Sequence, residues 1–177
     1  LRPVSFAVGA IEHHPGSVLV SFGKTKVMVC ATWENRVPPF RMGTGGGWLT
    51  ADYSMLACAT HDRKARPTGG QYDGRGVEIQ RLIGRALRQV VDVNVIGQRT
   101  IHIDCDVLQA DGGTRAAAIT GGWIALSICV GNLLGKGLPM KARRVDDIIK
   151  GQVAAVSLGV KNGEVLTDLC YEEDQHI

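Results

Sequence analysis

The segment Arg115–Leu134 constrains the fold more than any other, because it has the length of a helix and is apolar on nearly all sides. Small residues such as Ala116, Gly121 and Ala125 recur along it. A helix without a polar face is buried, and its small residues allow a sheet to approach closely. The sequence therefore predicts a central helix that other elements cover.

Strand patterns lie on both sides of this segment. Thr100–Gln109 alternates apolar and polar residues, which is typical of a strand with one buried face. Asn162-Gly163 lies between two β-prone runs and is a strong hairpin signal. Ser17–Phe22 and Thr25–Thr32 are predicted to form a hairpin around the turn Gly23-Lys24. A short strand is predicted near Trp48–Tyr53, after the loop Pro38–Gly47. The two runs beside Asn162-Gly163 are Val153–Val160 and Glu164–Tyr171.

A second helix is predicted to start at Glu78. Its apolar residues fall on one stripe from Ile79 to Val91, while Arg81, Arg85 and Arg88 lie on the opposite face. That face is either solvated or forms a basic ridge for an RNA backbone or a subunit partner. The preceding loop, Asp62–Gly76, is polar and rich in Gly and Arg, and its length suggests disorder or a binding role.

The order of these elements favours one α+β domain over residues 1–177, with helices packed on a mixed sheet. The chain has 177 residues, of which 45% are hydrophobic and 21% charged, as in globular proteins with a sizeable core. We find no run of about 18 consecutive apolar residues and no basic and apolar signal pattern at the start. We therefore expect no membrane association. The net charge of +3 is too small to indicate nucleic acid binding by itself.

The cysteines suggest a reducing compartment. They are odd in number, widely spaced and without a CxxC pair, so we interpret them as reduced core residues of a cytoplasmic protein. They are Cys30, Cys58, Cys105, Cys129 and Cys170.

The polar face of the strand Thr100–Gln109 carries His102, Asp104 and Asp106. These residue types are potential metal ligands. A polar strand face with local hydrogen bonds explains them equally well, so both interpretations stay open at the level of sequence.

A glycine-rich turn, Ala110–Gly113, joins this strand to the central helix. Thr114 and Arg115 follow, where the first free amides of the helix point outward. Free amides, the positive end of a helix dipole and a guanidinium group together form an oxyanion or phosphate site. The alternative is an ordinary loop in which Thr114 caps the helix.

Taken together, these residues resemble the ribonuclease PH family of phosphorolytic exoribonucleases. The resemblance covers nearly the whole chain in order. It implies a fold like the second domain of ribosomal protein S5 and a hexameric ring built as a trimer of dimers. The matching segments are Leu1–Val4, Gly16-Ser17, Phe22–Val27, Gly47–Leu56, Glu78–Arg85, Ile103–Arg115, Val153–Ser157 and Tyr171–Asp174.

The resemblance also implies an activity, namely phosphate-dependent 3′→5′ trimming of the 3′ trailers of tRNA precursors with release of nucleoside diphosphates. Inorganic phosphate is the co-substrate, and Mg²⁺ is the implied metal. In this chain Arg75, Thr114 and Arg115 match the phosphate-binding residues of the family, and Arg63 and Arg66 are the implied RNA-binding residues. Asp174 matches the first of two catalytic carboxylates, with a role in acid catalysis or metal binding.

The chain departs from the family pattern at several points. The second carboxylate falls beyond Ile177, and Cys58 stands where an arginine is usual. The segment that precedes Leu1 in the family and roughly the last quarter of its length are missing, so we expect this chain to be part of a longer protein. The incomplete carboxylate pair and the basic loop leave one alternative, a non-catalytic RNA-binding subunit of an exosome-like ring. A separate alternative is a structural scaffold in which Arg115 only forms an ion pair.

Overall fold

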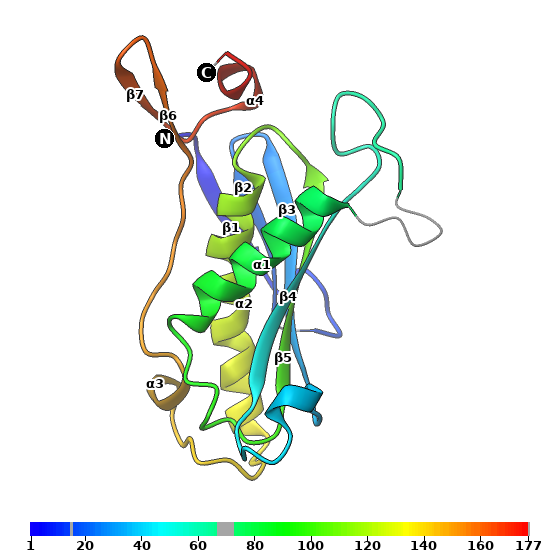
Figure 1. Ribbon diagram of the computed structural model, residues 1–177, viewed down its shortest axis with the longest axis vertical. Coiled ribbons are helices and arrows are strands. Elements are labelled where there is room, and N and C mark those ends of the chain that lie inside the picture. The colour runs from blue at the N-terminus through cyan, green and yellow to red at the C-terminus, as the bar shows by residue number, and fades with distance from the viewer. Residues whose placement is uncertain (15, 67–72, 177) are drawn as a thin grey trace.

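A computed structural model describes residues 1–14, 16–66 and 73–176 of the chain (Figure 1). Within these residues, five strands form one sheet in the order β1-β2-β3-β5-β4. Neighbouring strands are antiparallel except β4 and β5, which are parallel, so the sheet is mixed. The strands are β1 (Val4–Val8), β2 (Ser17–Phe22), β3 (Thr25–Glu34), β4 (Trp48–Met55) and β5 (Thr100–Gln109).

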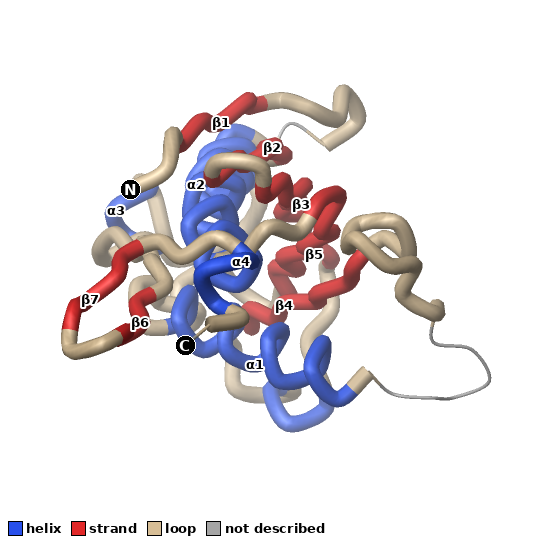
Figure 2. The backbone as a smooth tube through the Cα atoms, turned by 90° about the horizontal axis from the view of Figure 1, so that it is seen from above, coloured by secondary structure: helices blue, strands red, loops and turns tan. Residues whose placement is uncertain are grey.

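The helices cover one face of this sheet. Helix α1 (Gly74–Arg88) forms the crossover between the parallel strands β4 and β5, and α2 (Thr114–Gly135) follows β5. Both lie on the same side of the sheet when it is seen from above (Figure 2). The remaining helical turns are η1 (Pro39–Arg41), α3 (Val145–Ile148) and α4 (Tyr171–Asp174). The predicted α+β class is confirmed.

Alternation along the strands separates the buried face of the sheet from the open one. On β5, Ile101, Ile103 and Val107 are fully buried against the helices, while His102 and Asp104 are half-buried on the opposite face. Burying an apolar side chain of this size stabilises a fold by about 1.5–3 kcal/mol. The observed bounds of β5 agree with the predicted strand.

Helix α2 is the central helix that the sequence predicts. Gly121 allows the close approach, because a Cβ there would overlap Val20 on β2 and press on Val29 on β3. The length and mean hydropathy of α2, 1.7 over its most apolar window, would also suit a membrane span. Its packing on β2, β3, β5 and α1 accounts for the same apolar character, because the helix forms the core of this domain.

Helix α1 begins earlier than predicted, at Gly74 rather than Glu78. The two glycines of its first turn, Gly74 and Gly76, oppose a helix in isolation, and the apolar stripe starts only at Ile79. As a result Arg75 lies in the first helical turn and not in a loop. Residues 67–72 of the predicted loop Asp62–Gly76 lie outside the described part of the chain.

The predicted C-terminal hairpin forms but is shorter. It consists of β6 (Leu158–Lys161) and β7 (Glu164–Thr167), and Asn162 and Gly163 both have the positive φ of the expected turn. Residues 153–157 are not a strand, and Tyr171 starts α4. Instead of pairing in a strand, Val153 and Ala155 before β6 pack against the core, and the Ala155 amide donates to the Thr120 hydroxyl of α2 at 3.1 Å.

The five cysteines are all free, as predicted. Cys105 and Cys129 are buried in the core, and Cys30 and Cys170 are half-buried. Cys58 is exposed, so the interpretation of the set as core cysteines is wrong for this residue.

Candidate active site

The glycine-rich turn before α2 can be made only by glycine. Gly112 and Gly113 have φ of +76° and +67°, and a Cβ on Gly112 would overlap the carbonyl oxygen of Leu169. Thr25 holds the turn in place, because its hydroxyl donates to the Gly112 carbonyl (2.6 Å) and accepts from the Asp111 amide (2.9 Å). The start of α2 is therefore a fixed feature of the surface.

The amides at the start of α2 remain available to a ligand. The first helical hydrogen bond runs from the Ala117 amide to the Gly113 carbonyl, so the three preceding amides have no partner within the helix. Gly113 is the N-cap and no side chain caps the helix, so the alternative of Thr114 as the cap is wrong. The Thr114 hydroxyl instead hydrogen-bonds the Tyr53 hydroxyl at 2.9 Å.

This helix end opens into a pocket of about 780 Å³. The pocket brings together all four residues that the sequence predicts for phosphate binding and catalysis. They come from the first turns of two helices and from α4, and they are Arg75, Thr114, Arg115 and Asp174. Segments that are distant in sequence therefore converge on one cavity, as an anion site with more than one cationic group requires.

Arg75 and Arg115 bring positive charge to the pocket. Both guanidinium ends of Arg115 lie 3.3 Å from the Glu78 carboxylate, in an exposed pair that holds Arg115 only weakly. Burial raises the pKa of the Tyr53 hydroxyl, and the charges of Arg75 and Arg115 oppose that rise. Tyr53 therefore stays protonated near neutral pH, and either hydroxyl can be the donor in the hydrogen bond between Tyr53 and Thr114.

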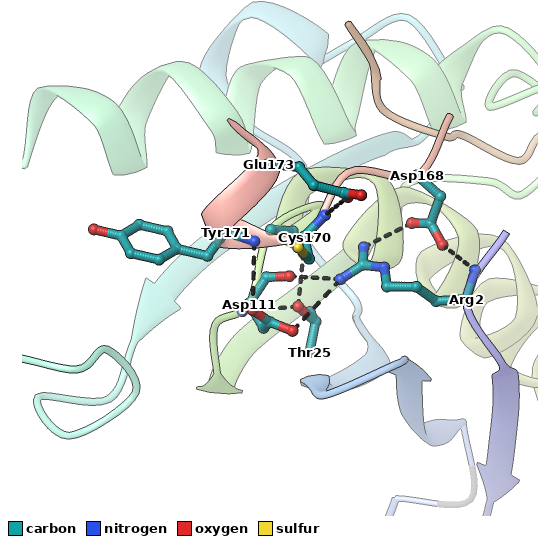
Figure 3. A network of polar contacts seen from close by, with 8 residues as sticks. Arg2, Thr25, Asp111, Asp168, Cys170, Tyr171 and Glu173 are labelled. Carbon is teal, nitrogen blue, oxygen red and sulfur yellow. Dashed lines mark hydrogen bonds and ion pairs between the residues drawn. The ribbon is translucent and has the colours of Figure 1, made fainter. Parts of the chain in front are cut away.

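A buried ion pair anchors the wall of the pocket (Figure 3). The Arg2 guanidinium lies 2.6 Å from Asp168 and also donates to the carbonyl oxygen of Asp111 in the glycine-rich turn (2.5 Å). The Arg2 amide donates to the second Asp168 oxygen at 2.8 Å. Arg2 lowers the pKa of Asp168, because it stabilises the ionised carboxylate. The network joins the residues just before β1, the glycine-rich turn and the segment that leads into α4.

Helix α4 presents Asp174 to the pocket. Its Tyr171 amide donates to the Asp111 carboxylate at 3.4 Å, and Glu173 caps the helix start by accepting from the Cys170 amide at 2.9 Å. No group of three metal-ligating side chains occurs among the residues that the structure describes. Mg²⁺ is commonly held by one or two carboxylates together with substrate oxygens and water, so Asp174 fits Mg²⁺ only as a partial ligand.

The predicted RNA-binding residues Arg63 and Arg66 are exposed but do not line this pocket. Lys64 lines it instead, and its ammonium group lies 2.6 Å from the Asp73 carboxylate just before α1. The sequence pointed to no role in the site for Lys64 or Tyr53. Tyr53 lies in a segment that matches the family, but nothing in the sequence around it indicates a hydrogen bond with Thr114.

The hypothesis that His102, Asp104 and Asp106 on β5 hold a metal is wrong, because no group of three metal-ligating side chains exists among the residues that the structure describes. The His102 ring lies 3.0 Å from the Glu34 carboxylate on the neighbouring strand. Burial, followed by the charge of Asp52, raises the pKa of Asp104. The face is therefore a polar strand face with cross-strand contacts.

The fold and the pocket define a class of protein, an α+β domain in which a helix N-terminus and two arginines line one pocket. Comparison with known proteins identifies the family. Residues 1–130 match the model of the 3′ exoribonuclease family, domain 1, so the chain belongs to this family.

Relatives and solved structures agree with this assignment. Ribonuclease PH of Halalkalibacterium halodurans is 51% identical over 177 residues, and that of Bacillus subtilis is 52% identical over 176. Each match covers 98% of this chain, which spans 66% and 70% of the respective relatives. Among solved structures, rice Rrp46 has a TM-score of 0.74 and 19% sequence identity, and the match covers 100% of this chain and 72% of the Rrp46 chain. The Archaeoglobus fulgidus exosome with RNA bound to the active site has a TM-score of 0.75 and 20% identity. That match covers 97% of this chain and 68% of the exosome chain. The predicted resemblance is confirmed.

Proposed function

We propose that this chain belongs to a phosphate-dependent 3′→5′ exoribonuclease that trims the 3′ trailers of tRNA precursors and releases nucleoside diphosphates. The observation that carries the proposal is the convergence of Arg75, Thr114 and Arg115 on one pocket with Asp174 at its edge. The relatives named Ribonuclease PH support it at 51–52% identity. Because the chain spans 66–70% of those relatives, the activity is proposed for the whole protein.

In the proposed reaction, the α2 amides, the Thr114 hydroxyl and the two arginines bind inorganic phosphate and neutralise its charge. They hold one phosphate oxygen in line with the last phosphodiester of the RNA. That oxygen forms the new bond to phosphorus, and the bond from phosphorus to the 3′ oxygen of the preceding nucleotide breaks. The terminal nucleotide leaves as a nucleoside diphosphate, and the 3′ oxygen takes up a proton.

Asp174 is the proposed acid or metal-binding group near the leaving oxygen. With substrate oxygens and water it would hold Mg²⁺, which stabilises negative charge on phosphate groups. A second candidate function is a non-catalytic RNA-binding subunit of an exosome-like ring, and the structural neighbours described as exosome assemblies support it. The names of the 51–52% identical relatives favour the catalytic function.

We also propose that the whole protein is a cytoplasmic homohexamer, a trimer of dimers, that binds the 3′ ends of RNA. Structural neighbours described as an archaeal exosome core and as an exosome with bound RNA support an oligomeric assembly. Sedimentation of the purified protein measures the number of subunits directly.

The test of the activity is incubation of the protein with a 3′-extended tRNA, Mg²⁺ and phosphate. Nucleoside diphosphates should be released in proportion to phosphate. Monophosphate products, or shortening that ignores phosphate, would exclude phosphorolysis, and RNA binding without turnover would favour the non-catalytic subunit.

Arg115→Ala tests the phosphate site. The expected result is a rise of about 10- to 100-fold in the KM for phosphate, the value of one hydrogen bond to a charged group. Arg36→Ala is the matched control, because Arg36 also forms an exposed ion pair with a glutamate, Glu34, at 2.7 Å. Both variants should leave the free energy of unfolding nearly unchanged, because exposed ion pairs contribute little to stability. A loss of stability in Arg115→Ala with an unchanged KM would support the scaffold alternative.

A further inference from the structure

Tyr53 is a half-buried residue that lies close to the start of both long helices. It is near the end of β4, on the face that packs against the helices, because Leu49 and Ala51 precede it at alternate positions and are buried there. Its ring packs against the core. The first turn of α1 is also close, since a Cβ on Gly76 would lie 3.5 Å from the Tyr53 carbonyl oxygen. The fold therefore fixes the position of the Tyr53 ring.

The Tyr53 hydroxyl reaches the pocket at the start of α2 only through Thr114. The two hydroxyl oxygens lie 2.9 Å apart, and Thr114 lines the pocket whereas Tyr53 does not. Burial raises the pKa of Tyr53, and its hydrogen bond with Thr114 opposes this rise. The charges of Arg75 and Arg115 oppose it as well. The Tyr53 hydroxyl is therefore coupled to all three side chains that are expected to bind phosphate.

A single proton decides how Thr114 can bind a ligand. A threonine hydroxyl has one proton to donate and two lone pairs that accept. If Thr114 donates to Tyr53, it has no proton left for an anion in the pocket. If Tyr53 donates instead, the Thr114 proton is free to bind an ionised phosphate oxygen, which only accepts. Of the two orientations of this hydrogen bond, only the one with Tyr53 as donor suits phosphate.

We propose that Tyr53 positions Thr114 for the phosphate co-substrate. The Tyr53 hydroxyl donates to Thr114, and the Thr114 hydroxyl then donates to a phosphate oxygen. Tyr53 itself does not touch phosphate. Consecutive hydrogen bonds polarise and strengthen one another, so the bond from Tyr53 also makes Thr114 a better donor. The inference rests on the proposed function, because it assumes that inorganic phosphate occupies the pocket at Thr114.

The alternative is that the Tyr53 hydroxyl only stabilises the fold. The hydrogen bond joins β4 to the first residue of α2 and would then act like any other tertiary contact. A structural role changes the stability of the protein and leaves the phosphate affinity of the folded molecule as it is. A positioning role changes the phosphate affinity, and does so only through the Thr114 hydroxyl.

The experiment measures the affinity of the whole protein for inorganic phosphate by calorimetry, without RNA. Tyr53→Phe keeps the ring and removes only the hydroxyl. It should weaken phosphate binding by about 3- to 10-fold, the value of one neutral hydrogen bond. In phosphorolysis of a 3′-extended tRNA, the KM for phosphate should rise by the same factor. The kcat at saturating phosphate and the KM for RNA should stay unchanged, because the lost contact serves phosphate binding.

A double-mutant cycle with Thr114 shows whether the effect passes through that residue. Thr114→Val keeps the shape of the side chain and removes its hydroxyl, so Tyr53→Phe should cause no further loss of phosphate affinity in that background. Thr114→Ser keeps the hydroxyl, so the loss caused by Tyr53→Phe should persist there. Ser127→Ala is the matched control, because it removes another half-buried hydroxyl of α2, one that donates to the Trp123 carbonyl at 2.8 Å. It should leave the phosphate affinity unchanged.

Equal phosphate affinity in Tyr53→Phe and the parent would overturn the proposal. A loss of the same size in the parent and in the Thr114→Val background would also overturn it, because the Tyr53 hydroxyl would then act on the fold and not through Thr114. A parent protein that releases nucleoside diphosphates but shows no effect of Tyr53→Phe would refute this inference alone. A parent that neither binds phosphate nor phosphorolyses RNA would refute the proposed function and this inference with it.

Discussion

Asp168 offers the sharpest test of how the candidate site is held together. The residue is only 3% exposed, and its two carboxylate oxygens accept from the guanidinium and the backbone amide of Arg2. Removing one member of a buried ion pair leaves the other charge without a partner, which costs about 3–5 kcal/mol. In a chain of this length, 1 kcal/mol corresponds to about 2–4 °C in Tm. Asp168→Ala should therefore lower Tm by roughly 6–20 °C.

Two further variants separate charge from backbone conformation. Asp168 has φ of +61°, which asparagine tolerates better than alanine and which glycine adopts freely. Asp168→Asn keeps the shape but loses the charge, so it should cost about 1.5–3 kcal/mol. Asp168→Gly removes any φ strain and should remain strongly destabilised, because the carboxylate is still absent. An Asn variant as stable as the parent at pH 7 would refute the ion-pair argument.

The pH dependence provides an independent check. Because Arg2 lowers the pKa of Asp168 in the folded state, the pair contributes its full stability above the unfolded pKa of about 3.9. That contribution is lost as the pH falls from there through the lower folded pKa. The difference in unfolding free energy between the parent and Asp168→Asn, measured by urea denaturation, should therefore be constant near neutral pH and shrink in acid. A difference that grows toward acid pH would contradict the assignment.

Two more predictions concern the turn and the cysteines. Gly112→Ala should destabilise the protein by more than about 1–2 kcal/mol, because the new Cβ clashes with a backbone carbonyl and φ at this position is positive. Gly131→Ala has open space at its Cβ position and should be neutral or stabilising when both variants are compared by thermal unfolding. Iodoacetamide at about pH 8 should label the exposed Cys58 and spare the buried Cys105 and Cys129. Burial raises the pKa of both core thiols, that of Cys129 to about 12, so they stay protonated and unreactive. A labelled core cysteine in mass spectrometry of the folded protein would contradict the packing.

The sequence alone determined the strands and helices with strong periodic patterns. The bounds of β5 agree with the predicted strand because alternation is a local property, and α2 is buried because no side of it is polar. The glycine-rich turn also had a local signal, since two adjacent glycines before a helix indicate positive φ. The resemblance to the ribonuclease PH family rested on such motifs in order, and family membership is confirmed. The roles of Arg75, Thr114, Arg115 and Asp174 stay predictions.

Only the tertiary structure decided how these parts support one another. The Arg2–Asp168 pair joins residues 166 positions apart, and the hydrogen bond between the Tyr53 and Thr114 hydroxyls joins residues 61 positions apart. No periodicity connects such positions, because they meet only when β4, β5 and the segment before α4 pack around the start of α2. The first turn of α1 was missed for the same reason, since its glycines carry no apolar signal and tertiary packing overrides their low helix propensity. The sequence thus specified the glycine-rich turn and the candidate residues, and the fold brought Arg75, Asp174 and that turn to one pocket.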